Sequence, residues 1–366
     1  MLRLIVSMVL ACGPVASLLS QSDSSRLRLS AYVDAYAAHY TDQRPPNALQ
    51  EVATVSPRSD RLGLNVAQLG LHYQAARLRG NLVLHAGDIA QATWSQTFRN
   101  VQRANVGLRL FDQVWLDAGF FTTHIGTESF LPKNNDLSST TVATYNEPFY
   151  QAGARLSYAG SERWTTELWL VNGYNFFLDA NAAKSVGVLL SYALSDTWTL
   201  SYSNLLGRES DDGIAPAQFR VYQNAYLTGT LAEERLRFSL GGDLGLQSHS
   251  ALFDSTSTAR MYNALLTLRY QFHPQWSLTT RAEVFDDPSG FISGLYSTNG
   301  IVPLQGLSLA GLTLGGEYRP LPQGYLRVEG RYLRTQTGLV MFDNDFDRRA
   351  RLEVMVTLGV FWEQAL

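Results

Sequence analysis

The chain has 366 residues, of which 45% are hydrophobic and only 17% charged, and its formal net charge is −3. Because a soluble domain usually carries about 25% charged residues, this composition indicates a surface that is short of charge. The near-neutral balance excludes a basic footprint for nucleic acid, and the abundance of aromatic and aliphatic residues excludes a disordered chain.

Residues 1–20 are typical of a signal peptide. A basic residue is followed by an apolar run and then by small residues, with cleavage expected near Ser17 or Ser20. The only cysteine, Cys12, lies in this segment, so an exported chain would have no disulfide and no cysteine-based site. We therefore expect one mature domain at 21–366, and it contains no run of about 18 apolar residues that predicts a membrane-spanning helix.

Side-chain polarity alternates with a period of two along most of the mature chain. Between Arg235 and Leu246, for example, every second residue is apolar or glycine. Such segments predict strands with one apolar and one polar face. About sixteen of them follow in chain order: 27–38, 62–73, 77–87, 102–111, 114–123, 149–158, 163–172, 185–194, 197–206, 219–230, 235–247, 261–272, 276–285, 308–318, 325–334 and 349–362. The segments 62–73 and 219–230 change face part-way, which predicts a β-bulge or a misplaced boundary in each.

The connections between these segments alternate between short and long. Every second link is a tight turn, whereas the others are long and rich in Gly, Pro, Asn, Asp and Ser. Aromatic side chains such as Tyr158, Trp164, Tyr192 and Trp276 stand beside the short turns, as in the interfacial girdle of a membrane barrel. Scattered aromatics of high β-propensity are the alternative. Because strands in hydrocarbon must have every edge paired, the pattern predicts an all-β, transmembrane, antiparallel up-and-down barrel with short periplasmic turns and long extracellular loops.

The polar faces of the strands would line a water-filled lumen, and this face is rich in arginine. We expect the basic lumen residues to be Arg28, Arg77, Arg79, Arg109, Arg155, Arg235, Arg237, Arg269, Arg281, Arg327, Arg331, Arg349 and Arg351. The acidic ones would be Asp34, Asp117, Glu167, Asp243, Glu283, Glu317, Glu329 and Glu353. Closure would gather Arg28, Arg327, Arg331, Arg349 and Arg351 on one side, which we call the arginine wall. These charges either pair across strands or form a ladder that favours anions.

The segment 124–148 is the longest predicted loop. It either folds into the lumen or remains an ordinary surface loop. If it folds inward, the sequence predicts that its charged residues line a constriction opposite the arginine wall: Glu128, Lys133, Asp136 and Glu147.

The residues described so far resemble the outer-membrane family "putative beta-barrel porin-2, OmpL-like". This resemblance rests on Tyr32–Tyr36 with Arg44–Asn47, on Leu64–Leu69, on Gly119–Glu128, on Asn134-Asn135 with Ser138-Ser139, and on Pro148 with Gly153–Arg155. Ser139 departs from the Arg expected between serines, and four residues follow the terminal aromatic pair Phe361-Trp362. The resemblance implies a porin-like channel without a defined solute.

Other candidate sites are weak. The run from Asp343 to Asp347 alternates carboxylates as calcium loops do, but it lacks the glycine and distal glutamate of an EF-hand, and a solvated acidic loop is the plainer interpretation. The six histidines show no zinc spacing. His85 could face a serine across the barrel, as an outer-membrane lipid hydrolase requires, but no motif accompanies it.

The sequence therefore predicts an outer-membrane channel for passive diffusion of small hydrophilic solutes, with modest anion preference from lumen arginines. We expect no enzymatic activity, cofactor, metal or nucleic-acid partner. The expected partners are the bilayer and its lipopolysaccharide, the solutes and the barrel-assembly machinery, and a homotrimer is left open. The alternatives are a non-conducting barrel that acts as adhesin or anchor through its loops, a lipid hydrolase, and a secreted soluble β-protein.

Overall fold

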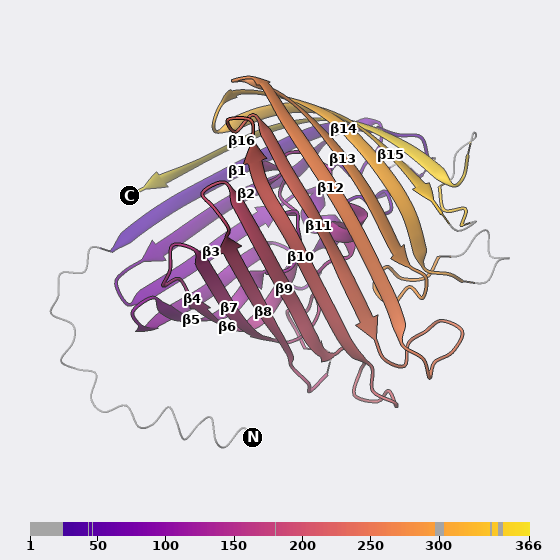
Figure 1. The fold of residues 1–366 in the computed structure, drawn as a ribbon, viewed down its shortest axis with the longest axis horizontal. Helices are drawn as coiled ribbons and strands as arrows, with labels where there is room; N and C mark the ends of the chain where they lie inside the picture. Colours follow the sequence, from indigo (N-terminus) through magenta and orange to yellow (C-terminus); the bar gives the residue numbers. More distant parts are fainter. Residues whose placement is uncertain are drawn as a thin grey trace.

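The chain forms one closed antiparallel barrel. The computed structural model describes residues 25–366 except 43, 46, 180, 297–303, 337–338 and 343–346. Within these residues sixteen strands pair in sequence order, and β16 closes the barrel against β1. Figure 1 shows the yellow end of β16 beside the indigo start of β1. The predicted barrel of about 16 strands is confirmed, whereas the predicted signal peptide lies outside the described residues.

The strand bounds agree with the predicted segments to within a few residues. The strands are β1 Arg26–Tyr40, β2 Arg61–Gln74, β3 Leu78–Ala86, β4 Val101–Phe111, β5 Val114–Thr122, β6 Tyr150–Tyr158, β7 Trp164–Val171, β8 Ser185–Ala193, β9 Trp198–Arg208, β10 Phe219–Leu231, β11 Leu236–Gln247, β12 Ala259–His273, β13 Trp276–Asp287, β14 Leu307–Leu321, β15 Gly324–Thr335 and β16 Ala350–Ala365. Seven short turns lie at one end of the barrel and eight long loops at the other. The start of β1 and the end of β16 both lie at the short-turn end.

Among the described residues, three short helical segments lie in the long loops. They are α2 Asp88–Thr93, η2 Pro132–Asn134 and α3 Val142–Asn146. Within the described ranges, no helix has the length and apolarity needed to cross a membrane.

Each strand has one face toward the lumen and one face outward. In β16, Arg351 and Glu353 are buried inside the barrel, whereas their neighbours Leu352, Val354 and Leu358 are exposed on its outer surface. The outer surface is apolar all round the barrel, which is the face that lipid requires. Next to the short turns, exposed aromatic rings pair across strands, with 4.3 Å between the ring centroids of Trp164 and Tyr192.

The predicted change of face in the second segment is a bulge, and the one in 219–230 is not. The pairing of β1 with β2 shifts between Asp34 and Ala35, so Asn65 is the extra residue on β2. The Asn65 amide donates to Asp34 (2.7 Å) and accepts from the Ser56 amide nitrogen (2.6 Å), which holds the first loop against the wall. Strand β10 pairs with regular register on both sides, so the predicted irregularity there is wrong. The sequence pattern is misleading because two tyrosines of β10 lie on the lumen face.

An apolar cluster fills part of the lumen at the long-loop end. It joins lumen-facing residues near the ends of many strands, such as Trp169, Leu205 and Phe285, to residues of the loops, such as Val142 and Leu339. All five have at most 4% exposed surface. The loops therefore cover the inner wall at this end and narrow the opening.

Candidate functional site: the loop inside the barrel

The segment 124–148, which we call the inner loop, lies inside the barrel. The carbonyl oxygen of Pro132 accepts from Arg327 of β15 (2.9 Å), and that of Ser139 accepts from Arg281 of β13 (2.6 Å). The amide nitrogen of Val142 donates to Glu283 of β13 (2.7 Å). Because all three wall residues point into the lumen, the inner loop is folded into the barrel and bonded to the sheet around β13–β16.

The sequence of the inner loop explains its local turns. Pro132 occupies the first turn of η2, where its missing N–H costs nothing. Thr141 is the N-cap of α3, and its hydroxyl accepts from the Thr144 amide nitrogen (3.3 Å). Val142 and Ala143 of this helix are buried in the apolar cluster. The helix thus packs its apolar side chains into the cluster, and its capped end is bonded to Glu283 of β13.

Most of the buried lumen arginines pair with carboxylates. Four arginines of β13, β15 and β16 have side chains that are at most 2% exposed. Their pairs are Arg281–Glu128 (2.8 Å), Arg327–Glu317 (2.8 Å), Arg331–Glu283 (2.7 Å) and Arg351–Glu353 (2.5 Å). Such groups hold the wall and the inner loop together, because removing one partner of a buried pair leaves an uncompensated charge that costs about 3–5 kcal/mol.

A second ionic cluster lies on the opposite part of the wall, on β3, β5, β6 and β7. Asp117 is fully buried and accepts from Arg79 (2.7 Å) and Arg155 (3.1 Å). Arg155 also donates to Glu167 (3.0 Å). The four charges balance one another, so this cluster adds little net charge to the lumen.

The other charged residues predicted for the lumen face differ in position. Arg28 pairs with Glu363 (2.5 Å) and Arg237 with Asp136 (2.6 Å), and in both pairs the arginine is 53% exposed. Arg109 pairs with Asp112 (3.2 Å) at the end of β4. The predicted lumen-face position is wrong for Arg77, Arg235 and Arg349, because β3, β11 and β16 each begin one residue later and leave these three in turns or loops. Asp34 is fully buried and bonds to Asn65 and to Tyr32 (3.1 Å).

The inner loop lies against the arginine wall and not across the lumen from it, so that part of the prediction is wrong. Its backbone carbonyl oxygens at Pro132 and Asn135 accept from Arg327 of the arginine wall. Its acidic residues Glu128 and Asp136 bond to Arg281 and Arg237, which lie outside the arginine wall. Glu147 is directed toward Asp243 of β11. Lys133 donates to the amide oxygen of Gln68 (3.2 Å) on the far side of the loop.

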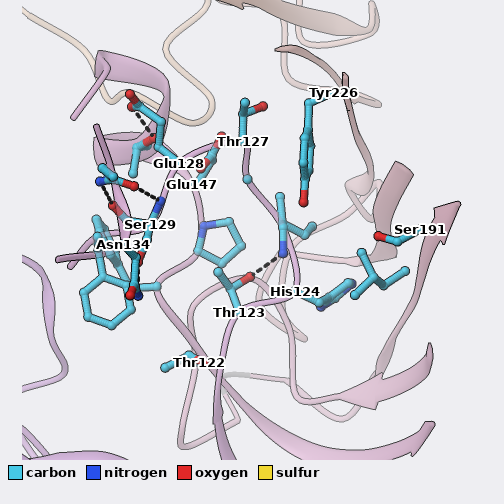
Figure 2. Close-up of a pocket in the computed structure, with 18 residues that line it drawn as sticks. Thr122, Thr123, His124, Thr127, Glu128, Ser129, Asn134, Glu147, Ser191 and Tyr226 are labelled. Atoms are coloured by element: carbon cyan, nitrogen blue, oxygen red, sulfur yellow. Dashed lines mark hydrogen bonds between the residues drawn. The ribbon is translucent and has the colours of Figure 1, made fainter. Parts of the chain in front are cut away.

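A cavity of about 390 Å³ lies between the inner loop and the wall of β8–β10. Figure 2 shows Tyr226 and Ser191 on the wall, facing the side where Glu128, Ser129 and Asn134 of the loop lie. Its lining mixes carboxylates, hydroxyls and amides with a few apolar side chains. Such a lining suits hydrated polar solutes better than apolar ones.

A second cavity of about 300 Å³ lies on the other side of residues 129–134. Thr122, Ser129, Phe130 and Asn134 line both cavities, so the two spaces adjoin across this segment. The second cavity contains two cationic side chains, Lys133 and Arg103. Arg103 was missed by the sequence reasoning, although its six-residue separation from Arg109 in the same strand places both on one face.

Burial shifts the pKa of three groups of the inner loop. Burial and the neighbouring Asp243 raise the pKa of Glu147 well above its ordinary value. Burial lowers the pKa of His124 to about 4, so its ring, stacked on Trp169, is neutral. Burial also lowers the pKa of Lys133.

A serine–histidine pair does occur in the lumen, although not at His85. Ser30 Oγ lies 3.0 Å from His72 Nε2, and the other ring nitrogen lies 2.8 Å from Asn81 Oδ1. These side chains come from adjacent strands and face the interior, away from the lipid that a lipid hydrolase must reach. His85 lies beside Gln102 (3.2 Å) and the ring of Trp94.

The one candidate metal site in the sequence, the run of carboxylates from Asp343 to Asp347, lies in the last long loop. Among the described residues, no group of three or more His, Cys, Asp or Glu side chains could hold a metal ion. The predicted calcium candidate stays a prediction, because Asp343 to Phe346 lie outside the described residues.

The sequence profile of the family "Putative beta-barrel porin-2, OmpL-like" matches residues 26–361. The chain belongs to this family. The resemblance seen in the sequence is therefore confirmed, and the protein is an outer-membrane β-barrel of the porin type. By the architecture of such barrels, its short turns are periplasmic and its long loops extracellular. No curated protein matches the chain.

Solved porin structures share the fold at low sequence identity. An anion-selective porin from Comamonas acidovorans is similar with a TM-score of 0.63 and 10% identity, covering 92% of this chain and 100% of that chain. A trimer form of OmpT from Vibrio cholerae has a TM-score of 0.56 and 9% identity over 93% and 100%. OmpF from Salmonella typhi, in complex with daunomycin, has a TM-score of 0.59 and 13% identity over 91% and 97%. These likenesses establish a common fold and carry no solute from one protein to another.

Proposed function

We propose that the chain is an outer-membrane channel through which small hydrophilic solutes diffuse passively, with the inner loop narrowing the path. The main support is the bonding of this loop to the inner wall at Arg281 and Arg327, which leaves polar cavities on both sides of residues 129–134. Size exclusion at the loop and weak contacts with the polar lining would then decide which solutes pass. Such a channel needs no cofactor and no catalytic step.

The arginine wall contributes little to selectivity in this proposal. Its buried members Arg327, Arg331 and Arg351 are each paired with a carboxylate, so their fields are largely cancelled beyond a few ångströms. A modest anion preference would have to come from lumen cations that lack such a partner.

A planar bilayer experiment tests the proposal. The mature chain is purified in detergent, checked for the heat-modifiable mobility of a folded barrel, and recorded under a salt gradient. Stable conductance steps support the channel. An anion-favouring reversal potential supports the anion preference, whereas steps without it would retain the channel and remove the preference.

A second candidate function is a barrel closed on its outer side that acts through its loops. The apolar cluster at the long-loop end favours it, because Val142 and Leu339 cover the inner wall at the extracellular end. Folded protein that never conducts would support this alternative.

The expected partners are the bilayer, lipopolysaccharide at the extracellular loops, the solutes and the barrel-assembly machinery. A homotrimer is also proposed, since the OmpT relative is described in a trimer form. Cross-linking of the detergent-solubilised chain, followed by unheated gel electrophoresis, separates trimer from monomer.

A further inference from the structure

Two lumen cations share one cavity and have no carboxylate partner. In the described part of the chain, no acidic side chain lies within 4.0 Å of Arg103 or Lys133, although nearly every other lumen cation has such a partner. The Nε atom of Arg103 is buried and has no hydrogen-bond partner among the described residues. Both side chains line the cavity of about 300 Å³ on the β1–β4 side of the inner loop.

Neutral groups hold Lys133 in place. Lys133 Nζ donates to Gln68 (3.2 Å) and lies 4.9 Å from the ring centroid of Tyr32 and 5.8 Å from that of Phe361. A side chain so placed is oriented without being neutralised. Arg103 lies on the lumen face of β4, opposite Val83 of β3. Neither cation is therefore paired directly with a carboxylate of the described residues.

The surrounding charges are already balanced. Glu363 is the acidic residue of the same cavity, and its carboxylate is bonded to Arg28 (2.5 Å). The neighbouring cluster on β3 and β5–β7 is internally paired around Asp117. The net charge of this part of the lumen is therefore positive, and its source is the Arg103–Lys133 pair.

We propose that Arg103 and Lys133 form a binding site for a compact oxyanion, a phosphate or carboxylate group of a solute, on the β1–β4 side of the inner loop. The inference rests on the proposed channel function and names the chemistry that the channel selects. A guanidinium and an ammonium meet such an anion with complementary geometry, one as a planar fork and the other as a point charge. Because the cavity is polar and open, the anion can leave again, as conduction requires.

The cavity also explains why the site is stronger than surface charges of the same kind. Exposed cations are screened by salt over a Debye length of about 8–10 Å, whereas partly buried cations are screened much less. Burial lowers the pKa of Lys133, and an anion bound beside it would raise that pKa again because the anion stabilises the ammonium form.

Phosphate binding tests the site without requiring conduction. Isothermal titration calorimetry of the folded barrel in detergent, with inorganic phosphate as the probe, is compared for wild type, Arg103→Gln and Lys133→Gln. Arg163→Gln is the matched control, because it removes one positive charge from an exposed periplasmic turn. We expect saturable binding that weakens by about tenfold in each cavity variant and is unchanged in the control.

Reversal potentials measured under a gradient of potassium phosphate complete the test. The two cavity variants should lose anion preference, and Arg103→Lys, which keeps the charge if Arg103→Gln does not fold, should retain most of it. Equal phosphate binding in all variants, or no saturable binding in wild type, overturns the proposal. Phosphate binding that depends on the two cations, in a barrel that never conducts, would retain the site and remove the channel.

Discussion

Replacing Arg281 by Met should release the inner loop from the wall. Arg281 of β13 is fully buried and donates to Glu128 (2.8 Å), to the carbonyl oxygen of Ser139 (2.6 Å) and to the hydroxyl of Ser139 (3.1 Å). Methionine keeps much of the aliphatic volume but donates to none of these groups. The variant leaves the Glu128 carboxylate buried without its cation.

The size of the effect follows from these contacts. Removing one partner of a buried ion pair costs about 3–5 kcal/mol, which shifts the docking equilibrium of the loop by more than a hundredfold. Adding Glu128→Gln should recover part of this loss, because the uncompensated charge is then gone. Arg237→Gln is the control: its pair with Asp136 is half-exposed and should contribute less than about 1 kcal/mol.

Trypsin provides a direct assay. Lys133 is the only lysine or arginine between residues 124 and 148, so cleavage after it reports release of the loop. Wild type and Arg237→Gln should resist cleavage there, whereas Arg281→Met should be cut and show larger single-channel conductance. A folded Arg281→Met barrel with wild-type resistance at Lys133 and unchanged conductance would refute the reasoning.

Three further predictions concern the loop and the barrel. Glu147 has a raised pKa in the docked loop, so docking is fully stabilised below the ordinary pKa of a glutamate and weakens as the pH rises through the shifted value. Conductance should therefore increase as the pH is raised above that ordinary value, and Glu147→Gln should abolish the dependence. Val142→Asp should open the channel, since an unpaired charge in the apolar cluster disfavours docking; unchanged conductance would contradict this. Gly119→Val should prevent heat-modifiable folding, because φ is +131° there and a Cβ would lie 2.3 Å from the Ala104 carbonyl oxygen; a normally folded variant would contradict it.

The barrel could be predicted from sequence because its signals are local. Alternation in a strand such as β16 follows from having lipid on one side and the lumen on the other, and the turn-forming residues mark each strand end. The exceptions have equally local causes. Tyr222 and Tyr226 of β10 face the lumen, and an apolarity pattern assigns such side chains to the lipid face.

The site was harder to predict because it depends on contacts between distant residues. The inner loop is held by pairs such as Ser139 with Arg281, which are 142 positions apart, and no local pattern encodes that distance. Whether an arginine is paired also depends on its cross-strand neighbours. Arg327 and Arg103 look alike in sequence, yet Arg327 is bonded to Glu317, whereas Arg103 has no carboxylate partner among the described residues.

Single-channel recording of wild type beside Arg281→Met tests the central claim most directly. If the barrel is a channel narrowed by the inner loop, both proteins should give stable conductance steps, and the steps of the variant should be larger. If both proteins are folded and heat-modifiable but give no conductance steps, the lumen does not conduct solutes. The protein would then act through the loops at its extracellular end.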